Sequence, residues 1–269
     1  MNILVCVKQV PDTENDTIKI DPATNTVIRD GVQCVMSDFD RYALEAAARI
    51  KDSDSSVQIV VMTVGPEQAR DVVKHSLSVS ADKAYLITDP AFSGSDAMAT
   101  SYIIAEAIKK IEDLEGRIDA IFFGKQAIDG ETAQVGPGVA EKLGYPQVTC
   151  CVGVSAADGR MIAEKEVKGG IERVSVSVPC ILTFAKPEWE PRFSTIKRKL
   201  AANKAVIPVL SANDIPSIDK NRVGPAGSKV KIKHTLVPEK KSGALMINEE
   251  TPEESAAELF KKLSRANII

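Results

Sequence analysis

The stretch with the clearest chemical content is a polar, glycine-containing loop in the middle of the chain. It reads GKQAIDGETAQVGPG over residues 124–138 and directly follows the apolar run 118–123. In an open α/β sheet, ligands bind at the carboxyl ends of strands, where such a loop would lie. Glycines allow the backbone to approach a ligand closely, and the first N–H groups of the next helix can point at phosphate. The loop therefore predicts a nucleotide site, with a structural turn as the alternative.

Several side chains of this loop are suited to contacts with a nucleotide. Thr132 and Gln134 offer neutral hydrogen-bonding groups, and Asp129 can either accept from a ribose hydroxyl or cap the turn. The run Gly136-Pro137-Gly138 suits a diphosphate at a helix N-terminus. It can equally do no more than start the helix, since proline is favoured there.

Other familiar catalytic machinery is missing from the sequence. We find no G-x-x-x-x-G-K-[ST] loop and no G-x-G-x-x-G after the first apolar run. The two histidines, His75 and His234, belong to no recognisable triad or metal cluster, and the five cysteines show no C-x-x-C spacing. We therefore expect no catalytic side chain and no metal in this chain, and a redox-active role for its thiols is not indicated.

Composition narrows the class of protein further. The 269 residues carry a formal net charge of −3 with both signs interspersed, which argues against nucleic acid as a partner. No apolar stretch approaches the length of a membrane span, and the N-terminus lacks the features of a signal peptide. An odd number of cysteines fits no disulfide framework. We expect a cytoplasmic protein with reduced thiols.

The hydrophobic pattern predicts an α/β fold. Short apolar runs alternate with helical patterns, which favours a parallel sheet with crossover helices. The first helix is expected to start near Ser37, whose side chain and the acidic residues after it suit a helix N-terminus, and the preceding residues 19–31 suggest an inserted hairpin. Further helices are expected after Gly65-Pro66 and over 96–112. The apolar runs lie at 3–7, 57–64, 84–87 and 118–123.

The pattern changes in the last 120 or so residues. Strand-like segments at 147–154, 161–167 and 172–184, separated by Asp158-Gly159 and Gly169-Gly170, predict added antiparallel strands. From 211 the chain becomes rich in proline and polar residues before a predicted helix at 252–264. We divide it into an α/β domain, 1–210, and an arm, 211–269, laid over another subunit, with a disordered tail as the alternative.

Three motifs together resemble one protein family. LVCVKQVPDT near the start, GKQAIDGETAQVGPGVAEKLGYPQ in the middle and EWEPRFSTIKRKLAANK after the last strands are similar, in order and spacing, to the β subunit of the electron-transfer flavoproteins. The resemblance covers nearly the whole chain. It implies a Rossmann-like nucleotide-binding fold and a heterodimer in which the C-terminal arm embraces an FAD-carrying α subunit.

The resemblance also implies which residues bind the cofactor of this subunit. They lie at the end of the first strand, before and in the first helix, at the end of the second strand and in the polar loop. The apolar members rest on the resemblance alone. The implied set is Cys6, Ser37, Asp38, Phe39, Asp40, Val64, Gly124, Lys125, Gln126, Ala127, Ile128, Asp129, Gly130, Glu131, Thr132, Ala133, Gln134 and Val135.

Two branches of the family differ in what this site holds. Housekeeping members hold AMP, whereas bifurcating members hold a second FAD that oxidises NADH and sends electrons to ferredoxin or flavodoxin and, through the α-subunit FAD, to an acyl-CoA dehydrogenase. The run 130–137 and Val10-Pro11-Asp12-Thr13 resemble the bifurcating branch, so we expect FAD. An AMP-holding electron carrier and a non-redox nucleotide-binding protein are the alternatives.

One segment matches the family's docking loop for acyl-CoA dehydrogenases. It lies within a recognition region at 184–205 and spans Pro187–Arg198, with two prolines, the only tryptophan and alternating charges. Ile196 aligns with the apolar side chain that anchors the dehydrogenase. The alternative is that Trp189 and Ile196 pack on the protein's own body.

Overall fold

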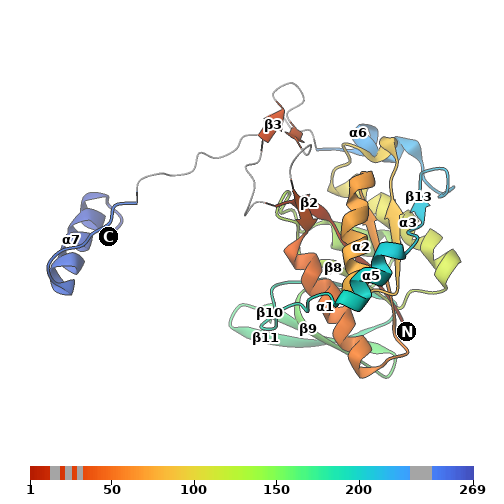
Figure 1. The fold of residues 1–269 in the computed structure, drawn as a ribbon, viewed down its shortest axis with the longest axis horizontal. Coiled ribbons are helices and arrows are strands. Elements are labelled where there is room, and N and C mark those ends of the chain that lie inside the picture. The colour runs from red at the N-terminus through yellow and green to blue at the C-terminus, as the bar shows by residue number, and fades with distance from the viewer. Residues whose placement is uncertain (13–18, 22–25, 29–32, 231–243) are drawn as a thin grey trace. The chain divides into compact units, whose positions relative to one another are not determined.

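The computed structural model describes residues 1–12, 19–21, 26–28, 33–230 and 244–269 (Figure 1). The chain divides into two compact units, Met1–His234 and Thr235–Ile269, and each is described by itself. Among the residues that the structure describes, no helix is long and apolar enough to cross a membrane.

A nine-stranded sheet forms the centre of the first unit, in the order β11-β10-β9-β12-β8-β1-β6-β7-β13. The six strands from β12 to β13 run parallel, and β9 is parallel to β12, whereas β10 is antiparallel to both β9 and β11. The strands are β1 (Asn2–Cys6), β6 (Gln58–Val64), β7 (Lys83–Ile87), β8 (Ala120–Gly124), β9 (Gln147–Ala157), β10 (Arg160–Val167), β11 (Gly170–Ser177), β12 (Cys180–Phe184) and β13 (Val209–Leu210).

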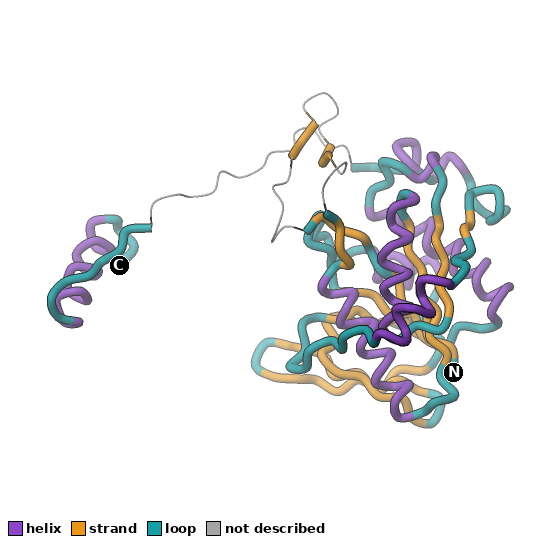
Figure 2. The backbone as a smooth tube through the Cα atoms, viewed as in Figure 1, coloured by secondary structure: helices purple, strands orange, loops and turns teal. Residues whose placement is uncertain are grey.

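Helices cover both faces of this sheet (Figure 2). Along β1, Ile3 and Val5 join one buried cluster and Leu4 and Cys6 the other, which explains why the strands read as continuous apolar runs. The helices α1 (Asp38–Ser53) and α2 (Arg70–Val79) lie on the first face, and α5 (Ile196–Lys204) packs on α2; α3 (Ala97–Glu115) and α4 (Val135–Leu143) lie on the other.

Shorter elements complete the first unit. Two small ladders precede α1: β2 (Gln9–Pro11) pairs with β5 (Cys34–Met36), and β3 (Lys19–Asp21) pairs with β4 (Thr26–Ile28). The second ladder confirms the inserted hairpin, although of the turn expected at Asp21 to Asn25 all but Asp21 lies outside the described residues. Single turns of 3₁₀ helix occupy Glu67–Ala69, Pro90–Phe92 and Lys220–Arg222, and α6 spans Gly224–Gly227.

The predicted fold class is confirmed, with two local differences. The segment predicted as one strand at 172–184 is two strands, because Pro179 interrupts it and proline cannot donate to a ladder. The second of these strands, β12, is a parallel member of the central sheet. After Gly65-Pro66 the chain first makes the 3₁₀ turn, and α2 begins only at Arg70.

Residues 211–230 still pack within the first unit. Ala212, Ile215 and Val223 are buried in the cluster under α3, and the Asp96 carboxylate at the start of α3 accepts the N–H groups of Lys229 and Val230. The boundary placed at 210 from the sequence therefore falls inside this unit. In the second unit, α7 (Pro252–Arg265) begins with a capping box. That this arm embraces a partner remains a prediction.

Candidate functional site

The predicted site residues converge on the carboxyl edge of the central strands. Cys6 ends β1 and pairs with Met62 of β6 and Phe123 of β8. The chain runs outward from β1 to β6 and β7 and then returns to β8 on the other side of β1, so the strand order reverses at β1. In open α/β sheets the ligand crevice lies at such a reversal, beyond the carboxyl ends of the strands.

Asp40 joins three of the segments that were predicted to form the site. It lies in the first turn of α1, and its carboxylate accepts the backbone N–H of Lys8 at 2.8 Å and that of Gly124 at 2.9 Å. The first donor follows β1 and the second ends β8. The carboxylate thus supplies acceptors to two backbone N–H groups where β1 and β8 end.

The surroundings of Asp40 favour its neutral form. Burial raises the pKa of Asp40 from 3.8 to about 7, and the nearby charge of Asp129 adds to the rise, while the two N–H groups and Lys8 oppose it. Burial and Asp40 together also raise the pKa of the Cys6 thiol well above its ordinary value. Cys6 is therefore a protonated core side chain here, in keeping with a role in packing rather than chemistry.

Asp40 should make the stability of the chain depend on pH. Because folding raises its pKa, Asp40 contributes stability in full below the unfolded value of 3.8, and this contribution is lost as the pH rises through about 7. Between pH 5 and 7 the free energy of unfolding should fall, relative to Asp40→Asn, by up to about 1.4 kcal/mol per pH unit. Urea unfolding of both full-length chains from pH 5 to pH 8 tests this, and parallel pH profiles would contradict it.

The polar loop after β8 is tied to the first strand by an ion pair. Lys8 Nζ lies 2.6 Å from Asp129 Oδ1. Asp129 therefore does more than cap its own turn, and its carboxylate is paired rather than left to solvent. Within the loop, Gly130 and Glu131 donate to the carbonyl of Ala127, which folds residues 127–131 into a tight turn. Residues 128–134 are exposed, so a ligand at this edge would meet them.

Two residues of the loop adopt a backbone conformation that is unusual for their type. Glu131 and Ala133 have φ values of 47° and 52°, in the left-handed region that non-glycine residues seldom occupy. Such conformations persist where the surroundings require them, and they occur often at ligand sites. The loop is thus shaped by more than local preference, which is consistent with the predicted site.

The helix after the loop presents an uncapped N-terminus. Gln134, at the N-cap of α4, makes no side-chain cap hydrogen bond, so the N–H groups of Val135 and Gly136 have no partner within the helix. The two glycines serve packing: a Cβ on Gly136 would lie 2.6 Å from Thr183 Cγ2, and one on Gly138 would lie 2.5 Å from Ser101 Oγ. The run Gly136-Pro137-Gly138 therefore starts the helix and lets it pack closely, while its N–H groups remain suited to an anion.

Buried polar atoms without partners gather near the same edge. Ser37 occupies the N-cap of α1, yet its side chain makes no cap hydrogen bond and its hydroxyl is buried without a partner. Thr63 Oγ1, one residue before the end of β6, and Gln9 Oε1 are likewise unpaired. Buried polar groups normally have hydrogen-bond partners. The expected cap at Ser37 is therefore absent, and this edge carries unused hydrogen-bonding capacity.

The structure brings the predicted residues into one region through these contacts. Gly124 ends β8 and the loop up to Val135 follows it, Ser37–Asp40 begin α1 against them, and Cys6 and Val64 end β1 and β6, the next two strands of the sheet. Sequence reasoning missed Lys8, whose position directly after the first apolar run was its only signal. Among the described residues, no group of three or more His, Cys, Asp or Glu side chains is placed to hold a metal ion.

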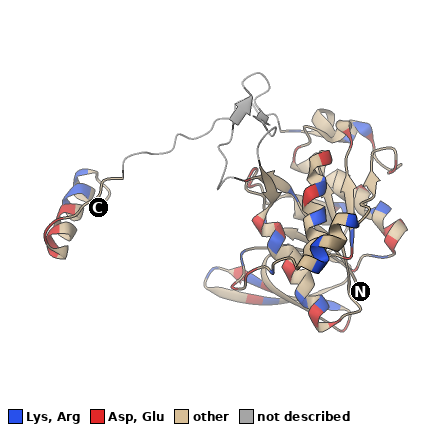
Figure 3. Ribbon diagram, in the orientation of Figure 1, with Lys and Arg blue, Asp and Glu red and all other residues tan. Residues whose placement is uncertain are grey.

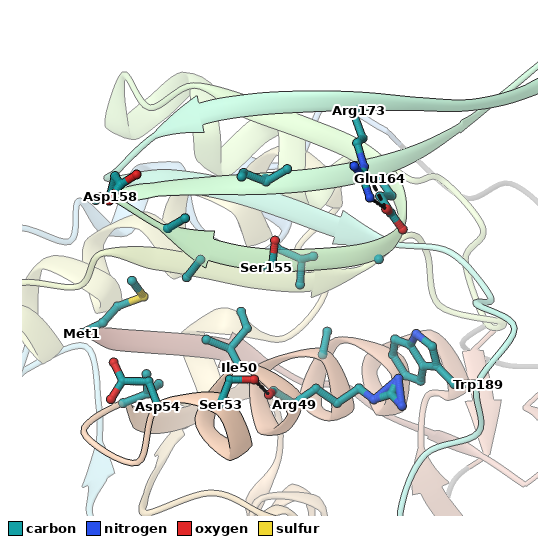
Figure 4. Close-up of a pocket in the computed structure, with 18 residues that line it drawn as sticks. Met1, Arg49, Ile50, Ser53, Asp54, Ser155, Asp158, Glu164, Arg173 and Trp189 are labelled. Carbon is teal, nitrogen blue, oxygen red and sulfur yellow. Dashed lines mark hydrogen bonds and ion pairs between the residues drawn. The ribbon is translucent and has the colours of Figure 1, made fainter.

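A separate groove of about 920 Å³ lies at the opposite end of the parallel strands (Figure 4). Met1, the C-terminal half of α1 and the strands β9 and β10 line it, and Arg173 and Glu164 close one side with a 3.0 Å ion pair. Because nucleotides bind open sheets at the carboxyl ends of the strands, we do not place the nucleotide site in this groove.

The two large apolar side chains of the recognition region, Trp189 and Ile196, differ in their contacts with the body of the protein. Trp189 packs on the body: its ring meets Tyr42 edge-on at 6.4 Å between centroids, and the Arg49 guanidinium lies 4.8 Å from its centroid. Ile196 is 80% exposed at the start of α5. The alternative of packing on the body thus holds for Trp189 and not for Ile196, which stays available to a partner.

The comparisons with known proteins agree with this geometry. The family model described as "Electron transfer flavoprotein domain" matches residues 24–215. The electron transfer flavoprotein subunit beta of Megasphaera elsdenii is 41% identical over the whole of both chains, and the caffeyl-CoA reductase-Etf complex subunit CarD of Acetobacterium woodii is 38% identical, also over the whole of both. Protein FixA of Azorhizobium caulinodans is 37% identical over 97% of this chain and 95% of its own.

A family match over most of the length and relatives aligned from end to end leave one reading of the sequence and the fold: the chain belongs to the electron transfer flavoprotein family, as a β subunit.

Proposed function

We propose that this subunit binds FAD at the carboxyl edge of β1, β6 and β8 and works, with its α subunit, as an electron-bifurcating flavoprotein that oxidises NADH. When bound, the FAD would accept a hydride from NADH and supply one electron to ferredoxin or flavodoxin and the other, through the α-subunit FAD, to an acyl-CoA dehydrogenase. The protein's part is to bind, orient and shield, so no catalytic side chain is required of this chain.

The observation that carries the proposal is the meeting of three elements at one edge. The side-chain carboxyl of Asp40 holds the ends of β1 and β8 together. The polar loop 125–134 follows β8 and faces solvent, and the uncapped N-terminus of α4 comes directly after it. The residues that would hold the cofactor are those of the loop and of the first turn of α1. The N–H groups of Val135 and Gly136 are suited to the diphosphate.

The choice of FAD over AMP is supported by the sequence of the loop and by the relatives. FAD extends a diphosphate and an isoalloxazine beyond the space that AMP fills, and the exposed side of residues 128–134 leaves this region accessible. Ala133 is small, which would suit a diphosphate at this loop. One relative belongs, by its name, to a complex of an Etf with a CoA-thioester reductase, which fits the proposed acyl-CoA dehydrogenase partner.

The proposed compartment is supported by the buried thiols. Cys6, Cys151 and Cys180 are buried as free thiols. Buried, unpaired thiols are typical of proteins that fold in a reducing environment. We therefore place the heterodimer in the cytoplasm.

Cofactor content tests the proposal most directly. The chain is co-expressed with its α subunit, and flavin and nucleotide are released from the heterodimer and quantified by absorbance and chromatography. We expect about two FAD and no AMP per heterodimer, because both subunits would then carry a flavin. One FAD and one AMP would make the protein a plain electron carrier, and no flavin at all would favour a non-redox nucleotide-binding protein.

A further inference from the structure

The stretch that leads to Ile196 has no regular secondary structure of its own. This stretch, residues 185–195, is called the recognition segment here; it leaves the sheet after β12 and ends where α5 begins. Ile196 itself is too exposed for contacts with the body to fix it. A side chain that enters a partner's pocket binds more tightly when it is ordered beforehand, since less entropy is lost on association. Contacts of the recognition segment must provide that order.

Arg192 attaches the recognition segment to α1. Its backbone N–H and its Nε donate to Glu45 Oε2 at 3.1 and 2.7 Å, and its Nη2 donates to Glu45 Oε1 at 3.0 Å. The other edge of the guanidinium meets Asp52, with Nη2 2.6 Å from Oδ2 and Nη1 3.2 Å from Oδ1. One planar group thus pairs with two carboxylates at once, which a lysine ammonium cannot do.

The burial of these groups makes the attachment firm. Glu45 is only 4% exposed, and a buried carboxylate is unfavourable unless it is paired and hydrogen-bonded. Arg192 provides three of its hydrogen bonds, and Arg49 Nε adds an ion pair at 3.6 Å. The bonds to Asp52 and Glu45 raise the pKa of Arg192, and the bond to Arg192 lowers the pKa of Asp52. Release of the segment would leave Glu45 buried with one distant partner.

A second attachment lies just beyond Ile196. Thr195 caps α5 by accepting the N–H of Arg198 at 3.2 Å, and Arg198 Nη2 donates to the carbonyl of Ala81, after α2, at 3.0 Å. Ala202 is buried as α5 packs on α2. Ile196 therefore stands between a fixed point on α1 and another beside α2, although its own side chain touches little.

We infer that Arg192, through Glu45 and Asp52, is a positioning residue for Ile196: it holds the recognition segment on α1 so that the dehydrogenase meets a preformed surface. This inference rests on the proposed docking function. Without these contacts the segment would have to be ordered during association. Loss of the Arg192 contacts should therefore raise KM for the dehydrogenase, while kcat at saturation and flavin content stay unchanged.

The experiment uses the whole heterodimer and an acyl-CoA dehydrogenase reduced with butyryl-CoA as the probe. Arg192→Lys keeps the positive charge but cannot pair with both carboxylates at once. Asp52→Asn weakens only the exposed pair, between Arg192 and residue 52, and leaves no buried charge unpaired. We expect KM to rise about tenfold for the first and about threefold for the second, which correspond to the loss of one strong and one weaker hydrogen-bonded pair.

Arg173→Lys is the matched control. Arg173 also forms a two-bond pair, with Nε and Nη2 at 3.1 and 3.0 Å from Glu164 Oε1. This pair lies on the β10–β11 hairpin, across the groove from Trp189, and does not involve the carboxylates that bind Arg192. We expect Arg173→Lys to leave KM unchanged. An equal rise in KM for this control, or a fall in flavin content for Arg192→Lys, would indicate a general structural effect and overturn the inference.

A double substitution separates this inference from the function on which it rests. If Arg192 acts by placing Ile196, then Arg192→Lys should have little effect in a chain that already carries Ile196→Ala. Fully additive effects on KM would overturn the inference, as would a normal KM for Arg192→Lys beside a raised one for Ile196→Ala. If Ile196→Ala itself exchanges electrons normally, the docking proposal fails, and the inference with it.

Discussion

Replacing Gly124 with alanine is expected to destabilise the chain by about 3 kcal/mol and to empty the nucleotide site. A Cβ at this position would lie 2.5 Å from Asp40 Oδ1 and 2.7 Å from both the carbonyl carbon and Cβ of Phe39. Two of these atoms belong to the side chains and one to the backbone of the first turn of α1, so the overlap cannot be relieved by one flexible group. The end of β8 and the start of α1 would have to separate.

That separation would also break the hydrogen bond from Gly124 to Asp40, on which the geometry of the site depends. We expect less than about a tenth of the normal β-subunit nucleotide to remain, since a loss of ~1.4 kcal/mol in binding is already tenfold. Urea unfolding and nucleotide analysis of the purified heterodimer measure both effects.

Gly130→Ala serves as the control for this prediction. Gly130 lies in the same loop, has nothing within 4 Å of a Cβ position and does not have a positive φ, so its replacement should change stability by no more than about 0.5 kcal/mol. Equal stability of Gly124→Ala and Gly130→Ala would show that β8 and α1 are not packed as described.

Ile196→Ala is expected to reduce kcat/KM for the dehydrogenase about thirtyfold, the equivalent of a 2 kcal/mol hot spot, and to leave stability and flavin content unchanged. The side chain is 80% exposed, so the folded chain gains little from it. A buried apolar anchor in a partner's pocket would gain much more from the same atoms. Electron exchange with the reduced dehydrogenase, measured over a range of dehydrogenase concentrations, tests the prediction.

Val206→Ala is the companion measurement. Val206 is an aliphatic side chain of similar size, 91% exposed just after α5 and outside the segment Pro187–Arg198. Its replacement should leave kcat/KM unchanged. Normal exchange by Ile196→Ala, or the same loss in both variants, would remove Ile196 from its assigned role as the anchor.

The sequence predicted the fold well where buried periodicity decides the structure. Residues 3–7, 57–64, 84–87 and 118–123 read as apolar runs because the strands they became are covered by helices on both faces. The interruption by Pro179 was also readable in principle, since the proline is visible in the sequence. It was missed because the flanking residues 172–184 keep a strand-like composition throughout.

The contacts of the site were less predictable, because they join residues far apart in the chain. Asp40 was identified as a site residue, but its acceptance of the Lys8 and Gly124 N–H groups depends on how β1 and β8 pair. In the same way, the alternating charges of PEWEPRF suggested an exposed loop, yet Arg192 bonds to a buried Glu45 147 positions away. The spacing of apolar residues along the chain does not indicate which distant residues pair. The order and pairing of the strands decide this.

Charge offered little to distinguish one face from another at the level of sequence. In the first unit, acidic and basic residues are interspersed over the surface elements (Figure 3), as the scattered pattern suggested. The helix α5 differs, since Lys197, Arg198, Lys199 and Lys204 are its only charged residues. The basic charge of α5 lies next to Ile196, the first residue of the helix. The sequence alone did not show that this end of the helix is exposed.

The helix α1 touches both regions to which a role is assigned. Its first turn holds the cofactor edge through Asp40, and Glu45 and Asp52, farther along its 16 residues, hold the recognition segment. The recognition segment of this chain, grafted alone into a relative, would arrive without the carboxylates of α1 that hold it. Exchange of dehydrogenase preference between members of this family is therefore best attempted by moving α1 and residues 185–204 together, as one transplantable module.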